Sequence, residues 1–296
     1  MRILVSGSSG LVGSALLPFL ASEGHAVTRL VRSAPAQGEA DWNPAAGTID
    51  AAALEGHDVV VHLAGANIGE RWTPEHKARI KDSRVKGTRL LAEALGRLAQ
   101  PPKVLVAASA IGYYGDRGDA RLREDSASGS GFLAEVVREW EAATATATAK
   151  GIRVVNLRTG VVLSPRGGAL AKMLLPFKLG AGGVMGSGKQ HWSWIAIDDL
   201  IAIIYFAATT EALKGPVNAV SPKPVTNLEF TKTLGRVLRR PTIIPMPAFA
   251  ARLALGEMAD ELLLSSTRVD PAKLTAAGYA FRFPELEGAL RHLLRR

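Results

Sequence analysis

Three evenly spaced glycines near the N-terminus, Gly7, Gly10 and Gly13, could bind a dinucleotide. An apolar run, Ile3 to Val5, precedes them and an apolar-periodic segment, Leu11 to Ala21, follows, which is the order strand, turn, helix. In that layout Gly7 allows a tight turn, Gly10 lets the backbone approach a pyrophosphate, and Gly13 permits close helix–strand packing. Free N–H groups at the helix N-terminus would bind the phosphates. A structural turn in an unrelated α/β protein is the alternative. The predicted contacts are Gly7, Ser8, Ser9, Gly10, Leu11, Val12 and Gly13.

The residue after the second expected strand, Ala26 to Val31, indicates which dinucleotide would bind. A carboxylate there would accept a hydrogen bond from the ribose 2′-hydroxyl, whereas an arginine suits a 2′-phosphate. This chain has Arg32 at that point, Arg29 shortly before it, and no acidic residue until Glu39. Since a guanidinium can bind a phosphate bidentately, the sequence predicts NADP(H) as the cofactor. A solvated arginine at a strand end is the alternative.

A third part of the predicted cofactor site follows the apolar strand Asp58 to His62. Small residues there would pass beneath the adenosine ribose and the pyrophosphate, where larger side chains would collide. Close packing at a strand end would favour the same small residues, so this loop adds little by itself. The predicted contacts are Leu63, Ala64, Gly65 and Ala66, with Arg84 added from the following helix.

The elements that must position these residues alternate between strand and helix. A long helix is predicted from Thr73 to Ala99, with Thr73 as its N-cap and a proline in its first turn. The strand Val104 to Ala107, the helix Phe132 to Lys150 and the strand Ile152 to Leu157 follow. This alternation predicts an α/β fold, a Rossmann-type doubly wound parallel sheet with a smaller C-terminal substrate lobe.

We expect two domains. Residues 1–220 would form an NAD(P)-binding domain, with segments of the substrate lobe beginning at about residue 164. Residues 245–296 would form a small helical domain, whose main helical segment is predicted from Ala248 to Leu264.

Composition excludes several classes of function. The chain of 296 residues contains no cysteine, and its six histidines show no metal-ligand spacing, so neither disulfides nor a metal centre is expected. The net charge of +9 is spread along the chain without aromatic interleaving, which argues against a nucleic-acid partner. No apolar run is long enough to span a bilayer and no leader is evident, so we expect a cytoplasmic protein without a membrane partner.

Longer motifs support a more specific interpretation. They are Gly7–Gly13, His62–Ile68, Arg71–Thr73, Gly87–Thr88, Ser109–Gly115, Arg158–Leu163, Gly167–Leu170, Trp192–Trp194 and Leu255–Ser266. With these motifs the chain resembles the extended short-chain dehydrogenase/reductase superfamily, which includes nucleotide-sugar epimerases and dehydratases. It is similar in particular to the atypical "epimerase family protein" subgroup, over nearly its whole length and including a small C-terminal domain.

The resemblance implies a catalytic serine, tyrosine and lysine, in which the lysine lowers the tyrosine pKa so that the phenol can transfer a proton near neutral pH. Ser109 is the implied serine, but Phe132 and Val136 occupy the Tyr-x-x-x-Lys positions. Three alternatives therefore stay open. The proton donor could be Tyr113 or Tyr114, assisted by a cation; it could be a carboxylate; or the site could bind nucleotide without turnover. The candidate cations are Arg84 and Lys81, and the candidate carboxylates are Glu135 and Asp116.

The loop Gly186 to Trp194 is the best candidate for substrate contact, because it combines small residues with polar and aromatic side chains. The predicted substrate residues are Gln190, Trp192, Trp194 and Arg158, although Arg158 could instead form an ion pair. The favoured function is an NADP(H)-dependent oxidoreductase or epimerase acting on an unassigned carbonyl or sugar-nucleotide-like small molecule. The alternative is a non-catalytic NADP(H)-binding regulatory or interaction protein. A homodimer formed through the two long helices is possible.

Overall fold

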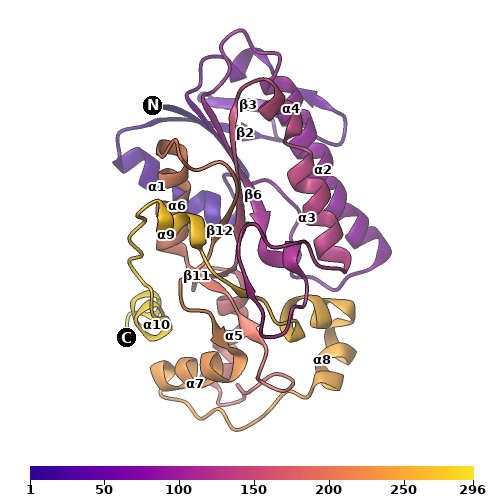
Figure 1. Ribbon diagram of the computed structural model, residues 1–296, viewed down its shortest axis with the longest axis vertical. Helices are drawn as coiled ribbons and strands as arrows, with labels where there is room; N and C mark the ends of the chain where they lie inside the picture. Colours follow the sequence, from indigo (N-terminus) through magenta and orange to yellow (C-terminus); the bar gives the residue numbers. More distant parts are fainter.

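The computed structural model describes residues 1–296 and is built around one eight-stranded sheet (Figure 1). The strand order is β12-β8-β6-β5-β1-β2-β3-β4, and every neighbouring pair is parallel except β3 and β4. The strands are β1 (Arg2–Ser6), β2 (Ala26–Val31), β3 (Glu39–Asn43), β4 (Thr48–Ile49), β5 (Val59–His62), β6 (Val104–Ala110), β8 (Arg153–Thr159) and β12 (Gly215–Ala219). The predicted Rossmann-type parallel sheet is confirmed.

Helices cover both faces of this sheet, as a doubly wound fold requires (Figure 1). On one face lie α1 (Leu11–Ser22), α6 (Ile197–Thr209) and α9 (Ala272–Ala276), which share a core with Val5 and Val61. On the other lie α2 (Pro74–Leu95), α3 (Phe132–Ala142) and α4 (Ala145–Ala149); α2 and α4 contribute to a core with Leu4 and Val60. Successive strand residues therefore point to opposite cores.

A smaller lobe lies beyond the carboxyl ends of the strands (Figure 1). Trp194 and Phe230 are at the centre of its apolar core, together with Leu290 from the C-terminal segment. Its main elements are β9 (Val161–Leu163), α5 (Gly168–Lys178), β10 (His191–Trp192), β11 (Trp194–Ala196), β13 (Val225–Thr226), α7 (Asn227–Leu238), α8 (Ala248–Leu255) and α10 (Leu286–Leu294). The division into domains 1–220 and 245–296 stays a prediction.

Two further strands, β7 (Arg121–Leu122) and β14 (Arg268–Val269), pair in parallel across a sequence separation of almost 150 residues. Short helical turns complete the chain: η1 (Ala52–Leu54) and η2 (Ile111–Tyr114) are 3₁₀ turns, and η3 (Ala259–Leu264) is a π-helix. No helix of the chain has both the length and the apolar character needed to cross a membrane.

Two predicted helices are interrupted. The segment Phe132–Lys150 breaks between α3 and α4, where the Thr144 hydroxyl donates to the Glu141 carbonyl at 2.7 Å, a local bond that competes with helix continuation. The predicted helix Ala248–Leu264 breaks at Gly256, whose φ of 63° is left-handed. By contrast the N-cap of α2 is as predicted, since the Thr73 hydroxyl accepts from the His76 N–H.

A buried hydrogen-bonded chain lies directly under the loops that follow β1 and β5. His62 Nδ1 is 2.6 Å from Ser6 Oγ, and His62 Nε2 is 3.0 Å from Thr88 Oγ1, which also accepts from Trp140 Nε1 at 2.9 Å. Burial lowers the pKa of His62 to about 4, so this imidazole is neutral near pH 7. The network joins β1, β5, α2 and α3, and Ser6 and His62 are the last residues of β1 and β5.

Acidification should therefore destabilise the fold through His62. In the unfolded chain the imidazole takes up a proton below about pH 6.5. The folded protein binds that proton only near pH 4. The free energy of unfolding should accordingly fall between pH 6.5 and pH 4, by about 3 kcal/mol from this residue.

Urea unfolding across that range, compared between the wild type and His62→Gln, isolates the contribution. The variant should be less stable at pH 7 and should lose much of the dependence on pH. His292→Gln, on the half-exposed face of α10, should retain it. An unchanged slope in His62→Gln would show that the imidazole does not resist protonation.

Candidate cofactor site and catalytic residues

The glycine turn between β1 and α1 has the geometry that its spacing predicts. Gly7 has a φ of 70°, and a Cβ there would lie 2.6 Å from the carbonyl carbon of Leu63. A Cβ on Gly13 would lie 2.3 Å from the Gly7 carbonyl oxygen. Both glycines are therefore required by backbone packing within the protein.

Gly10 differs, because a side chain at this position would press on the protein much less. A Cβ there would meet only the Gly7 oxygen, at 3.3 Å. Gly10 is the N-cap of α1, no side chain caps this helix, and its first turn holds no acidic residue. The unpaired N–H groups of the first turn thus remain available to an anion, with the helix dipole favouring it. Of the two intervening serines, Ser8 is buried and Ser9 is exposed.

The end of β2 leaves one arginine without a partner. Arg29 is ion-paired with Glu39, and the same carboxylate accepts from the Ala36 N–H at 2.9 Å. Arg32 is exposed and forms neither an ion pair nor a side-chain hydrogen bond. The nearest carboxylate in the sequence is therefore already occupied, and Arg32 keeps its charge for a ligand.

The loop after β5 lies against α2. The Ala66 N–H donates to Ser83 Oγ at 2.9 Å, and a Cβ on Gly65 would lie 3.3 Å from the guanidinium carbon of Arg84. That guanidinium donates to the Ile80 carbonyl and has no carboxylate partner. Burial lowers the pKa of Arg84 to about 10, which is still well above neutral pH. An arginine so covered without a counter-ion is unusual, and it lies beside the predicted cofactor loop.

Ser109 is not directed into an open site. It is buried, and its hydroxyl donates to Glu141 Oε1 at 2.6 Å. Side chains alternate along β6, so the partly exposed Ala108 and Ala110 lie on the opposite face. Glu141 is also held by Arg158, whose Nε and Nη2 each donate to it at 2.8 Å. Ser109 is therefore hydrogen-bonded within the protein and Arg158 forms the ion pair that was the alternative for it, while the predicted roles of both toward a substrate stay predictions.

Tyr114 is likewise part of the folded core. It is fully buried, its hydroxyl lies 2.7 Å from Asn218 Oδ1, and it accepts from Arg158 Nη1 at 3.1 Å. Burial raises the pKa of Tyr114 to about 12, although Arg158 partly opposes the rise. The Tyr114 hydroxyl is thus engaged inside the protein, and its catalytic role stays a prediction. Tyr113 is partly exposed, its ring centroid is 3.4 Å from the Arg158 guanidinium carbon, and its hydroxyl has no protein partner.

The start of α3, where the resemblance places a tyrosine, is capped by the C-terminal segment. The carboxylate of Glu261 accepts from the N–H groups of Phe132 and Leu133, at 3.2 and 3.3 Å. The Phe132 ring itself contacts Trp72 and lies beneath the Lys77 ammonium. Sequence reasoning missed Glu261, because no local pattern links it to a helix that begins 129 residues earlier.

The remaining candidate groups are engaged on the surface. Lys81 pairs with Glu135 and Glu139 at 3.0 and 2.8 Å, and these hydrogen bonds raise the pKa of Lys81. Asp116 accepts from the N–H groups of Gly118 and Ser266, which shapes a turn. The candidate carboxylates Glu135 and Asp116 are therefore both engaged by partners within the protein.

Three of the predicted substrate residues are in the interior of the lobe. Trp194 is fully buried and its indole donates to the Lys223 carbonyl at 3.0 Å. Trp192 and Gln190 are buried, and both donate to the Leu263 carbonyl, at 3.3 and 3.1 Å. These residues join β10 and β11 to the rest of the lobe, and their contact with a substrate stays a prediction.

Comparison with known proteins agrees with this architecture. Residues 3–219 match the model of the NAD dependent epimerase/dehydratase family, and residues 246–293 match a domain of unknown function, DUF1731. The chain belongs to the NAD dependent epimerase/dehydratase family. The predicted membership of its "epimerase family protein" subgroup is confirmed by the relatives that follow.

Several relatives match along their whole length. Epimerase family protein Mb2239 of Mycobacterium bovis is 44% identical over 97% of this chain and 96% of its own length. Human epimerase family protein SDR39U1 is 39% identical over 99% of this chain and 100% of its own. A crystal structure of the human protein with NADPH has a TM-score of 0.91 at 37% identity, with both chains fully covered. UDP-N-acetylglucosamine 4-epimerase from Bacillus cereus, at 17% identity and a TM-score of 0.78, shares the fold.

Removing one partner of the Arg158–Glu141 pair should be costly. Glu141→Gln leaves a buried guanidinium without a counter-charge, and we expect the free energy of unfolding to fall by about 3 kcal/mol or more. Glu139→Gln, whose carboxylate is on the exposed side of α3, should change it by less than about 1 kcal/mol. Urea unfolding at pH 7 measures both. Equal stability of the two variants would contradict the structural role assigned to Glu141.

Proposed function

We propose that this protein binds NADP(H), with the pyrophosphate at the glycine turn and the 2′-phosphate at Arg32. The observation that carries the proposal is the contrast between Arg29, neutralised by Glu39, and Arg32, which is exposed and unpaired. Gly10 and an uncapped α1 supply a matching place for the pyrophosphate. The NADPH in the similar human structure supports the same assignment.

Bound NADPH would supply a hydride, and the chain would have to supply a proton donor. Tyr113 is the phenol that remains partly exposed next to β6, its hydroxyl has no partner within the protein, and the Arg158 guanidinium lies over its ring. We therefore propose an oxidoreductase or epimerase acting on an unassigned carbonyl or sugar-nucleotide-like molecule, with Tyr113 as the proton donor in place of the missing Tyr-x-x-x-Lys pair.

A second function is favoured by a different observation. Phe132 replaces the usual tyrosine, while the hydroxyls of Ser109 and Tyr114 are hydrogen-bonded to buried side chains. Binding and turnover have separate residue requirements, so a non-catalytic NADP(H)-binding regulatory or interaction protein is the alternative. A homodimer formed through α2 and α3 and a cytoplasmic location remain compatible with either function.

Calorimetric titration with NADPH and NADH tests the cofactor assignment. Arg32→Ala should weaken NADPH binding by about tenfold to a hundredfold, since one charged contact to a phosphate is lost, and leave NADH binding almost unchanged. Gly10→Ala should weaken both nucleotides, because the new methyl group occupies the space for the pyrophosphate.

Arg97→Ala, just beyond the C-terminal end of α2, is the matched control and should behave as wild type. Each variant is first shown to be folded and free of carried-over nucleotide. Wild-type protein that binds neither nucleotide would overturn the proposal.

Turnover separates the two functions. NADPH oxidation with a panel of small carbonyl compounds should be lost in Tyr113→Phe, while the calorimetric affinity for NADPH is retained. If Tyr113→Phe oxidises NADPH at the wild-type rate, the phenol is not the proton donor. Tight NADPH binding without turnover of any compound by the wild type would favour the non-catalytic alternative.

A further inference from the structure

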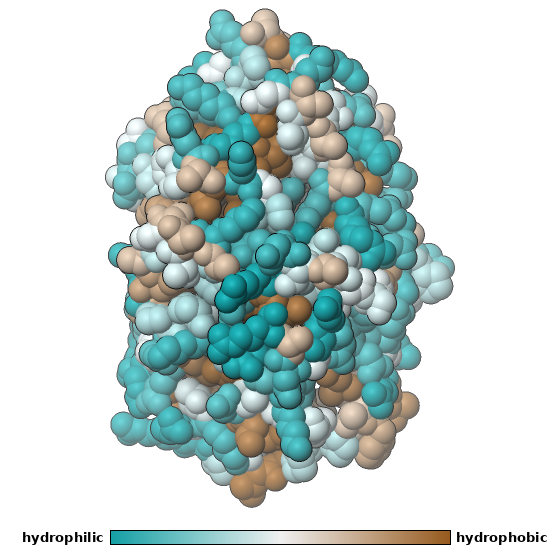
Figure 2. All heavy atoms as spheres, viewed as in Figure 1, coloured by the Kyte–Doolittle hydropathy of each residue, from teal (hydrophilic) through white to brown (hydrophobic).

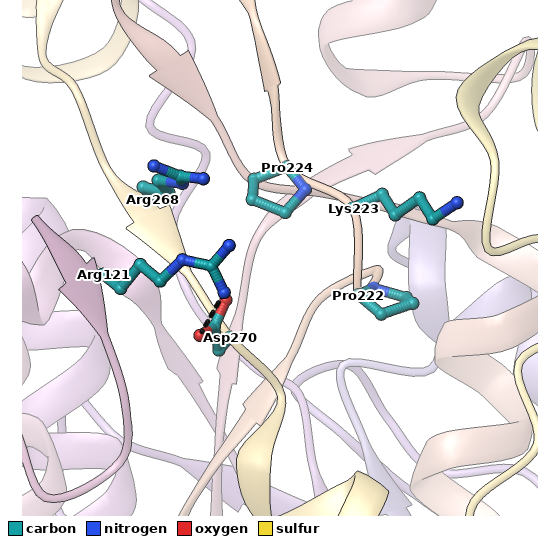
Figure 3. Close-up of a pocket in the computed structure, with 6 residues that line it drawn as sticks. All are labelled: Arg121, Pro222, Lys223, Pro224, Arg268 and Asp270. Carbon is teal, nitrogen blue, oxygen red and sulfur yellow. Dashed lines mark ion pairs between the residues drawn. The ribbon is translucent and has the colours of Figure 1, made fainter. Parts of the chain in front are cut away.

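A basic pocket lies apart from the glycine turn. It has a volume of about 260 Å³ and is formed by β7, β14 and the connection between β12 and β13 (Figure 3). Figure 2 shows strongly hydrophilic residues gathered in the middle of the face that carries these strands. The residues that line the pocket are Arg121, Pro222, Lys223, Pro224, Arg268 and Asp270.

Two arginines are paired across the strands in this pocket. In the parallel register of β7 and β14, Arg268 is the partner of Arg121, and Val269 is the partner of Leu122. Leu122 and Val269 are buried, so both arginines point to the opposite, outer face. Like charges placed directly opposite each other destabilise a strand pair. We therefore expect a negatively charged partner that offsets the repulsion between Arg121 and Arg268.

The protein supplies only part of that compensation. Asp270 is 3.6 Å from Arg121 Nη1 and 4.0 Å from Arg123 Nε, so one carboxylate serves two guanidinium groups. Arg268 has neither an ion pair nor a side-chain hydrogen bond within the protein. Lys223 is neutralised by Glu285, and its ammonium points away from the arginines (Figure 3). An excess of positive charge therefore remains at the arginine pair.

We propose that this pocket binds the phosphoryl group of a small phosphate ester between Arg121 and Arg268. Planar guanidinium groups form bidentate hydrogen bonds with phosphate oxygens, and a bound dianion would remove the repulsion between the two arginines. The rings of Pro222 and Pro224 form a rigid wall without N–H donors. The volume is slightly below the roughly 300 Å³ at which sites for drug-sized ligands begin, which suits a small ester.

The pocket is distinct from the proposed cofactor site. Pro222 follows shortly after β12, the strand at one edge of the sheet, whereas the glycine turn follows β1. Four strand-to-strand steps separate β12 from β1, which at about 4.8 Å each is roughly 19 Å. The inference therefore does not rest on the proposed function.

The unfolding temperature in inorganic phosphate and in chloride at equal ionic strength gives a first test. The Arg32→Ala background is used throughout to remove the contact proposed for the 2′-phosphate, and any phosphate at the glycine turn affects all variants alike. Phosphate should raise the unfolding temperature of this parent protein more than that of Arg121→Gln or Arg268→Gln. In chloride, Arg268→Gln should unfold about 1–2 °C higher than the parent, because the repulsion is removed.

Lys223→Gln is the matched control, since this residue lines the pocket but pairs with Glu285. It should keep the response to phosphate. An equal response to phosphate in the parent and both arginine variants would overturn the proposal. Loss of the response in Lys223→Gln to the same extent as in the arginine variants would overturn the assignment to the arginine pair.

A direct measurement uses phosphorus NMR with glycerol 3-phosphate as the ester probe. The phosphorus line of the probe should broaden in the presence of the parent protein and of Lys223→Gln, and stay narrow with Arg121→Gln or Arg268→Gln. This readout does not depend on stability, so it remains informative if a variant unfolds at a lower temperature. Equal line widths with all four proteins would show that the pocket does not bind a phosphate ester.

Discussion

The buried ion pair between Arg158 and Glu141 is the constraint on which the centre of this molecule depends. Two charges taken out of water are tolerated only when nearly all their hydrogen-bonding groups find partners. Here the Ser109 hydroxyl donates to the carboxylate, while the Tyr114 oxygen and the Glu124 carbonyl accept from the guanidinium. Burial alone would lower the pKa of Arg158, but the hydrogen bonds and charge of Glu141 more than reverse that effect. The polar side chains next to β6 are thereby committed to holding β6, β8 and α3 together.

These buried contacts distinguish the predicted cofactor contacts from the residues expected to act on a substrate. The predicted cofactor contacts at the ends of β1 and β2 retain unpaired donors, since α1 is uncapped and Arg32 is free. Of the residues expected to act on a substrate, Ser109, Tyr114 and Arg158 are hydrogen-bonded inside the protein, whereas the Tyr113 hydroxyl has no partner there. Glu261 adds to this division, because a carboxylate from the C-terminal segment occupies the first N–H groups of α3. Nucleotide binding is therefore better supported by the geometry than any particular reaction.

The parts of the site that could be predicted from the sequence are those determined by neighbouring residues. The glycine spacing, the Thr73 cap and Arg32 after β2 each follow from a few consecutive positions. The orientation of Ser109 could not be predicted, because both faces of a buried parallel strand are apolar. The alternation of side chains along the strand therefore does not show which face lies toward a binding site. Trp192 and Trp194 were ambiguous for a related reason: an aromatic residue suits a substrate site or a core equally well. Only the packing of α7 against these strands, seen in the core that contains Phe230, places them inside.

A comparison of the arginines shows what distinguishes a structural side chain from one available to a ligand. Arg158 is buried and all its groups are engaged, so its charge contributes to folding. Arg84 is largely covered, has no carboxylate and contacts the loop at Gly65, while Arg32 and Arg268 have no partner of any kind. A guanidinium that the protein leaves without a carboxylate keeps its charge and its donors for an anion, so its position beside a loop or a pocket is informative. Arg32 and Arg84 lie at the end of β2 and the neighbouring loop, and Arg268 lies in the pair of β7 and β14. At each of these two places a bound anion would complete the hydrogen bonding of a guanidinium group.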